Sequence, residues 1–533
     1  MMTIAMENNA SSADPPEVIS LQRAIDWIMR SDRSALLFVG VFAAALILPF
    51  LGVREITTSG EAQRAYPPIE MLKTGDLMIP RLNGEVYLEK PPLMYWMTLP
   101  SYVIFGVNEF SARIVDALMG TALVLVVFNW CRQMGDRRIS VLAAMICAAN
   151  YLFIDNAREC QVDMGLALFT TLTLQDWWKG MKALEENAPR SAKLNFYRGA
   201  LWLAIAHMFK MPVPFLFVLS AFVGTACIIR KWKWLRWPHV WSACLLSTLP
   251  FVIWTAFLIS KLGLEDTIHP WWDELRSHIG PHASSTQKGP VTFYLFSLFI
   301  YFIPWSFLFP VLLMRKFERS QRKDRMTFYF LWCSIAIPII GLSINTAKET
   351  EYMLCAIAPL SILLARSIHY LRQNVQNRIL QRLTGRRVLI TSFAGYLLGM
   401  WFWNPVYESF YYVKRTPKAL VRNALAMAAE EDRPVVYFCH DSPKLYFYVG
   451  EIKPYIPDLD GQLYYLREHP NAIIFGEPKR MKELAIHHGN LHFDEIGKAP
   501  SKLAFSAYKI DDSSEHDPPS EESSRRRPAD KDI

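Results

Sequence analysis

Charged residues are scarce in this 533-residue chain, at 20% of the sequence, whereas hydrophobic residues make up 52%. The mean hydropathy is +0.13. A soluble enzyme of this size would normally be more polar. The apolar residues form recurring blocks of roughly 18 to 22 residues, each about long enough to cross a bilayer as one helix. The composition argues against a soluble enzyme and predicts an α-helical, multi-pass integral membrane protein.

Other absences in the sequence argue against several classes of protein. The eight cysteines form no CxxC pair and lie mostly in apolar blocks, which excludes a disulfide framework. We expect no cleavable signal, because the first apolar block follows a polar stretch of about 34 residues. No internal repeat is visible, which weakens the case for an inverted-repeat transporter. The net charge of +8 lies in short runs between apolar blocks, so the expected surroundings are membrane lipids and no nucleic acid.

A hydropathy window of about 19 residues predicts eleven crossings within a transmembrane region at 35–404. The apolar block at 93–105 is short, so we interpret it as an interfacial or re-entrant helix, and the total is about 11 to 13 helices. The predicted crossings are 35–52, 112–130, 139–157, 162–178, 198–209, 211–229, 240–260, 292–313, 327–343, 350–365 and 388–404.

The basic residues predict the orientation. Segments on the same side as the N-terminus carry 27 Lys and Arg in 82 residues, whereas the opposite loops carry 11 in 106. This asymmetry predicts that the N-terminal segment 1–34 is cytoplasmic and that the chain after the last crossing is extracytoplasmic. The first group comprises 23–34, 131–138, 179–198, 230–237, 315–326 and 366–387, and the second comprises 53–111, 157–163, 210, 261–290 and 344–352.

The composition changes after the last crossing. Residues 405–510 resemble a small soluble α/β domain, with helical periodicity from Ala419 and buried strands from Pro434 and Asn471. The tail 511–533 lacks apolar content and is predicted to be disordered.

The first outer loop, 53–111, is too long for a simple connection. It contains Glu89 and Lys90 before two prolines and an aromatic segment. Lys90 could supply a point charge to a phosphate headgroup, and Glu89 could hold a divalent metal ion that shares that phosphate. On spacing alone, an ordinary loop with a Pro-Pro turn is an equal alternative.

This loop resembles the GT-C membrane glycosyltransferases, in particular the lipid A aminoarabinose transferases and protein O-mannosyltransferases. The strongest element is Glu-Lys-Pro-Pro-Leu-x-Tyr-Trp after Leu-Asn-Gly, and further elements follow in the same order along the membrane region. The matching segments are Gly60–Arg64, Glu70–Asp76, Pro80–Gly84, Glu89–Trp96, Asn108–Arg113, Arg158–Asp163, Phe209–Pro212, Ile303–Ser306 and Ser343–Tyr352.

The resemblance implies a polyprenyl-phosphate-linked sugar donor, a divalent metal ion, and a bacterial inner membrane location. Lys90 would hold the donor phosphate, and Lys210 would add positive charge. Tyr352 would donate a hydrogen bond to the phosphate or the sugar. Arg276 would bind phosphate, although a salt bridge within the loop is an equal interpretation of Arg276. Glu89 would help to bind a metal ion or the phosphate network, and the substrate-binding set is Lys90, Lys210, Arg276, Lys348, Tyr352 and Arg64. Separately from the resemblance, His269 could complete a metal site with Glu89, although a lone histidine in a loop is more often a solvated surface residue.

The chain departs from the family at the aspartate of the Asp-Glu pair, where it has Gly60 before Glu61. Glycine cannot accept a proton, so another carboxylate must be the base or the activity is altered or lost. We expect Glu61 to be the base and Asp163 to be the next candidate. The structural alternatives are a helix cap for Asp163 and a snorkelling side chain for Lys210.

The resulting hypothesis is a glycosyltransferase that moves a sugar from a polyprenyl phosphate to a lipid, glycan or protein acceptor at the outer face. Two alternatives stay open. A non-catalytic protein that binds the lipid-linked sugar is consistent with Gly60. A transporter or flippase would need charges on both faces, whereas the charged set here is predicted on one face.

The orientation can be tested with reporter fusions. A reporter fused after residue 404 should be active only outside the cytoplasm, and one inserted in 315–326 only inside, because the basic loops are retained in the cytoplasm. Cytoplasmic activity of the fusion after residue 404 would contradict both the crossing count and the outer placement of the site.

Overall fold

The computed structural model describes residues 23, 25–278, 289–345, 348–374, 386–407, 417–438, 442–488, 493–498 and 506–510. The chain divides into two compact units. One comprises Met1–Arg54 with Gly60–Phe410, and the other comprises Glu55–Ser59 with Tyr411–Ile533.

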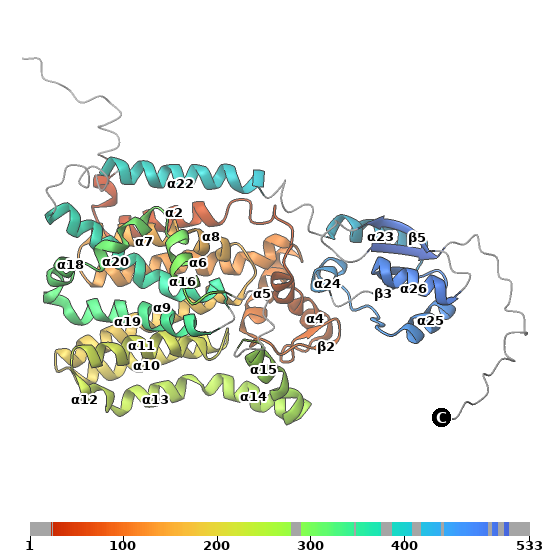
Figure 1. Cartoon of the computed structure of the whole chain (residues 1–533), viewed down its shortest axis with the longest axis horizontal. Coiled ribbons are helices and arrows are strands. Elements are labelled where there is room, and N and C mark those ends of the chain that lie inside the picture. The colour runs from red at the N-terminus through yellow and green to blue at the C-terminus, as the bar shows by residue number, and fades with distance from the viewer. Residues whose placement is uncertain are drawn as a thin grey trace, which may run out of the picture. The chain divides into compact units, whose positions relative to one another are not determined.

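The first unit is built of helices, and its long members lie roughly along one direction (Figure 1). The helices of the bundle are α2 (Asp32–Ile47), α6 (Glu109–Gln133), α7 (Arg137–Ala148), α8 (Tyr151–Ala157), α9 (Val162–Glu185), α10 (Pro189–His207), α11 (Val213–Ile228), α12 (Trp232–Leu235), α13 (Pro238–Ser247), α14 (Leu249–Leu262), α16 (Phe293–Tyr301), η1 (Trp305–Leu308), α17 (Phe309–Leu312), α18 (Arg315–Ser320), η2 (Arg322–Asp324), α19 (Arg325–Ile344), η3 (Thr350–Met353), α20 (Leu354–Asn374) and α22 (Arg386–Tyr407).

By length and hydropathy, four helical stretches in the described residues could cross a membrane. Two bent pairs raise this number to six, α7 with α8 at 64° and α16 with Trp305–Leu312 at 113°. Each of the eleven predicted crossings overlaps a helix or a helix pair. The helices outside these four stretches and two bent pairs are shorter or more polar than a single span requires. The helical membrane fold is confirmed, and the number of crossings stays a prediction. The four stretches are Glu109–Gln133, Pro238–Leu262, Arg322–Ile344 and Thr350–Asn374.

The first outer loop is folded into short elements that gather at one end of the bundle with α15 (Figure 1). The helix expected at 93–105 is present with those bounds, whereas the two shorter helices and the hairpin were not predicted. These elements are α3 (Ser59–Ala65), α4 (Pro67–Thr74), β1 (Arg81–Leu82), β2 (Glu85–Val86), α5 (Leu93–Phe105) and α15 (Leu264–His278).

The second unit contains a four-stranded mixed sheet of order β3-β4-β6-β5, in which β3 and β4 are parallel and the other pairs antiparallel. The helix and two strands predicted from Ala419, Pro434 and Asn471 are α23, β3 and β4; β5 and β6 were not predicted. Residues 511–533, predicted to be disordered, lie outside the described residues. The elements are α23 (Lys418–Glu430), β3 (Val435–Tyr437), α24 (Pro443–Val449), α25 (Leu459–Glu468), β4 (Ile473–Gly476), α26 (Pro478–His488), β5 (Phe493–Lys498) and β6 (Ser506–Ile510).

Candidate active site

The polar residues of the family-like motifs fold the first outer loop. Asn83 and Gly84 join β1 to β2 with positive φ values of 52° and 89°, which a tight hairpin turn requires. The backbone N–H of Gly84 donates to Oε1 of Glu70 at 2.7 Å, and burial raises the pKa of Glu70. Asp76 accepts hydrogen bonds from the backbone of Met78 at 3.0 Å and of Ile79 at 3.2 Å. Glu70 and Asp76 therefore shape the loop that carries the candidate site.

Three tryptophan side chains donate hydrogen bonds to backbone carbonyls of the same loop. The indole Nε1 of Trp96 donates to the carbonyl of Leu77 at 2.6 Å, and that of Trp254 to Met78 at 3.0 Å. Trp271 of α15 donates to the carbonyl of Leu88, immediately before Glu89, at 2.6 Å. None of the three tryptophans was among the predicted site residues, although Trp96 ends the family-like segment Glu89–Trp96. Tryptophan is also enriched at membrane interfaces.

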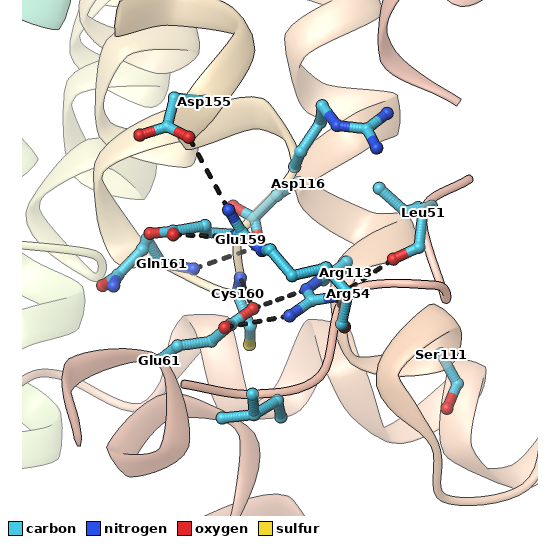
Figure 2. A network of polar contacts seen from close by, with 12 residues as sticks. Leu51, Arg54, Glu61, Ser111, Arg113, Asp116, Asp155, Glu159, Cys160 and Gln161 are labelled. Atoms are coloured by element: carbon cyan, nitrogen blue, oxygen red, sulfur yellow. Dashed lines mark hydrogen bonds and ion pairs between the residues drawn. The ribbon is translucent and has the colours of Figure 1, made fainter. Parts of the chain in front are cut away.

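Glu61 lies in a buried ion pair with Arg113 of α6, and neither side chain is exposed (Figure 2). Arg113 donates from Nε to Oε1 at 2.6 Å and from Nη2 to Oε2 at 3.0 Å. The backbone N–H of Cys160 donates to Oε1 at 3.2 Å. Burial alone would raise the pKa of Glu61, but the charge and hydrogen bonds of Arg113 outweigh it and lower that pKa. This arrangement argues against Glu61 as the base, because an ion-paired carboxylate with a lowered pKa accepts a proton poorly.

Arg54 binds two other carboxylates close to this pair (Figure 2). Its Nη2 lies 2.7 Å from Oε1 of Glu159, and its Nη1 lies 3.7 Å from Oδ1 of Asp155. Burial raises the pKa of Glu159 to about 7, the charge of Arg54 lowers it, and the charge of Glu61 adds to the increase. Glu159 lies two residues before Gln161, in the same short connection as Cys160. Glu159 was not among the predicted site residues, although it is an acid inside the family-like segment Arg158–Asp163.

Gly60, where the family has aspartate, faces this connection. A Cβ atom placed on Gly60 would lie 3.5 Å from Nε2 of Gln161, an ordinary van der Waals distance. The structure therefore has room for a Cβ atom at position 60.

Asp163 and Lys210 form a second ion pair, with Nζ of Lys210 at 2.9 Å from Oδ1 of Asp163. The Nζ atom also lies 4.4 Å from the ring centroid of Tyr352. Burial lowers the pKa of Lys210, but the charge of Asp163 more than compensates and raises it. The pair depends on close packing, because a Cβ atom on Gly165 would lie 2.3 Å from the ring of Phe209. Three predicted residues, Asp163, Lys210 and Tyr352, are thus in one cluster.

Arg64 and Glu89 are linked through Tyr87. Arg64 donates to the Tyr87 hydroxyl at 2.5 Å, and that hydroxyl donates to Oε2 of Glu89 at 2.5 Å. Nη2 of Arg64 lies 3.9 Å from the same carboxylate oxygen. Lys90 follows directly and is half-buried. Arg64 and Glu89 therefore lie together, and Lys90 is the next residue along the chain.

The remaining predicted residues have other surroundings. Lys348 is 1% exposed, and its Nζ donates to the carbonyls of Ser343 at 2.8 Å and Leu342 at 3.3 Å, which caps the C-terminal end of α19. Arg276 is exposed, with its guanidinium 5.2 Å from the ring centroid of Trp272. His269 pairs with Asp273 at 2.9 Å, and its side chain is 64% exposed.

A metal site at Glu89 and His269 stays a prediction. The two side chains have separate partners, and the described part of the chain contains no group of three His, Cys, Asp or Glu side chains that could hold a metal ion. We therefore assign no step of the chemistry to a metal.

Known proteins share parts of this sequence and most of this fold. The family model for dolichyl-phosphate-mannose-protein mannosyltransferase matches residues 89–254. An uncharacterized protein of Aquifex aeolicus is 28% identical over 62% of this chain and 63% of its own length. The undecaprenyl phosphate-alpha-4-amino-4-deoxy-L-arabinose arabinosyl transferase of Pseudomonas savastanoi pv. phaseolicola is 25% identical over 63% of this chain and 61% of its own. The chain thus matches about three-fifths of the length of these relatives.

The crystal structure of ArnT from Cupriavidus metallidurans in the apo state has a TM-score of 0.70 at 18% identity, covering 91% of this chain and 98% of that one. The same protein bound to undecaprenyl phosphate gives a TM-score of 0.69 at 18% identity, covering 89% and 97%. The fold and these matches define a polytopic membrane protein with the fold of the GT-C glycosyltransferases. In sequence and fold the chain resembles the lipid A aminoarabinose transferases and the protein O-mannosyltransferases, as its loop motifs predicted.

The Glu61–Arg113 pair can be tested by its effect on stability. Glu61→Gln should lower the free energy of unfolding by about 3–5 kcal/mol, because Arg113 would stay buried without a counter-charge. Thermal unfolding in detergent measures the loss, with Glu85→Gln on the exposed strand β2 as the control. An unchanged unfolding temperature for Glu61→Gln would contradict a structural role for the pair.

Proposed function

We propose that the protein transfers a sugar from a polyprenyl-phosphate-linked donor to a lipid, glycan or protein acceptor at the outer face of the membrane. Support comes from the loop motifs and from relatives whose names specify undecaprenyl phosphate and aminoarabinose transfer. A pentose such as 4-amino-4-deoxy-L-arabinose is the first sugar to test, and the bacterial inner membrane is the proposed location.

One contact carries the proposal. The backbone N–H of Leu93 donates to the carbonyl of Met208 at 3.3 Å, which brings the start of α5 against the end of α10. Lys90 lies three residues before that contact, and Lys210 lies two residues after it. Two cations from segments far apart in sequence therefore lie beside one backbone junction, with the carboxylate of Asp163 on Lys210. Cations next to carboxylates suit a phosphate leaving group and an acceptor that loses a proton.

The proposed reaction is a displacement at the anomeric carbon. The acceptor hydroxyl oxygen forms the new bond to that carbon, the bond from the carbon to the phosphate oxygen breaks, and the polyprenyl phosphate leaves with the electron pair. Lys90 and Lys210 stabilise the negative charge on the leaving phosphate. The acceptor proton passes to a carboxylate of the site.

We propose Glu159 as this base, in place of Glu61 and ahead of Asp163. Glu61 is bound to Arg113 through both oxygens, and Asp163 is paired with Lys210. Glu159 shares its cation, Arg54, with Asp155, and it lies in the connection that faces Gly60. Its carboxylate would replace the function of the aspartate that the family has at position 60.

Lys90→Ala should weaken binding of undecaprenyl phosphate by about 10- to 100-fold, because a charge-assisted contact to an ionised phosphate is lost. Equilibrium binding to the purified chain measures the effect. Lys73→Ala is the matched control, since Lys73 is an exposed lysine of the same loop, at the end of α4. Equal affinities for wild type and Lys90→Ala would refute the assignment.

Turnover with undecaprenyl phosphate 4-amino-4-deoxy-L-arabinose should rise with pH through about 7, because Glu159 accepts a proton only when it is ionised. Glu159→Gln should remove turnover and leave binding of undecaprenyl phosphate intact, whereas Asp155→Asn, on the same arginine, should retain turnover. Gly60→Asp in the Glu159→Gln background should restore turnover. Full activity of Glu159→Gln would exclude Glu159, and loss with Asp163→Asn alone would assign the base to Asp163.

Gly60 also favours a second candidate, a non-catalytic protein that binds the lipid-linked sugar. The two functions separate in one experiment. If the wild-type chain binds undecaprenyl phosphate and never turns over the sugar-linked donor, while Gly60→Asp gains transfer, the binding function is correct.

A further inference from the structure

The structure contains a cavity of about 330 Å³ between the α6–α7 connection, the segment around η2 and the end of α20. It lies at the end of the bundle near α18, whereas α4, α5 and α15 lie at the opposite end (Figure 1). The basic-residue asymmetry predicts that this end is cytoplasmic. The cavity is therefore separate from the candidate active site. Polar and charged side chains form much of its lining, including Asp136, Gln321, Lys323, Asp324, Arg366 and His369.

Arg366 is the buried cation of this cavity, with 9% of its surface exposed. Its Nη1 donates to Oε1 of Gln321 and its Nη2 to Oδ2 of Asp324, both at 3.4 Å. These distances exceed the usual range for N–H···O bonds, so both contacts are weak. Asp324 also pairs with Lys182 at 3.5 Å. One carboxylate thus pairs with two cations, Lys182 and Arg366.

A segment rich in Lys and Arg contributes to the lining. Residues 315–325 contain six Lys or Arg and two Asp or Glu, and the exposed Lys323 of this segment lines the cavity. The other acid of the lining, Asp136, already caps α7, with Oδ1 accepting from the backbone N–H of Arg138 at 2.6 Å. Basic pockets between transmembrane helices at the cytoplasmic side are suited to anionic lipid headgroups.

We propose that this cavity binds a phosphate group, with Arg366 and Lys323 as its cationic contacts. The volume corresponds to about ten water molecules at roughly 30 Å³ each, which is enough for a phosphate and an attached glycerol. The ligand is a glycerophosphate, supplied either by the headgroup of an anionic phospholipid or by a free phosphate ester. The proposal does not depend on the transfer reaction, because none of these residues belongs to the candidate active site.

The experiment uses the full chain in nanodiscs of phosphatidylcholine, titrated with a fluorescent phosphatidylglycerol, and the chain in detergent, titrated with glycerol 3-phosphate. Lys323→Gln should weaken binding about tenfold or more, because a charged contact to phosphate is lost. Arg319→Gln is the matched control, since it removes one charge from the same exposed segment and does not line the cavity. Arg366→Gln should weaken binding further, and its unfolding temperature shows whether it folds.

The outcomes distinguish a phosphate site from diffuse surface charge, and a lipid ligand from a free phosphate ester. Binding of phosphatidylglycerol that Lys323→Gln weakens and Arg319→Gln retains supports the site and identifies a lipid source. Binding of glycerol 3-phosphate in detergent with the same dependence on Lys323 supports the site and identifies a free ester. Equal loss in Lys323→Gln and Arg319→Gln would overturn the proposal in favour of diffuse surface charge. Absence of binding by the wild-type chain in both titrations would overturn it outright.

Discussion

The buried ion pair of Glu61 and Arg113 is the constraint on which the end of the bundle that carries the candidate site depends (Figure 2). Arg113 also donates to the carbonyls of Leu51 and Arg54, and Glu61 accepts from the backbone of Cys160. One pair therefore joins α3, α6, the end of the first crossing and the connection before α9. Removing two charges from water is costly, and the pair is tolerable because each charge is met by several hydrogen bonds.

Two glutamates in this region, Glu61 and Glu159, differ in pKa. Glu61 pairs with Arg113 and has a lowered pKa, whereas Glu159 shares Arg54 with Asp155 and has a pKa raised to about 7. The difference arises from the ratio of carboxylates to guanidinium groups in a buried environment, where desolvation favours the neutral acid. Glu159 lies two residues before Gln161, whose Nε2 is 3.5 Å from the position of a Cβ atom on Gly60.

Residues matched by resemblance serve two kinds of purpose. Glu70 and Asp76 bind backbone N–H groups and shape the outer loop, and Lys348 caps α19. Lys210 instead forms an ion pair with Asp163, and its Nζ atom lies over the ring of Tyr352. A motif match alone does not separate these purposes, because a side chain that stabilises a loop and one that contacts substrate can occur at equally characteristic positions.

The sequence by itself determined the helical membrane fold, the helix at 93–105, the strands β3 and β4 and the loop that carries the site, because apolar runs and turn residues act locally. The motifs also selected Asp163, Lys210 and Tyr352, which the structure brings into contact. Only the tertiary structure decided that Glu61 is bound by Arg113 and that Glu159 shares Arg54. These partners are about 50 and 105 residues apart, and helix packing, which no local pattern encodes, brings them together.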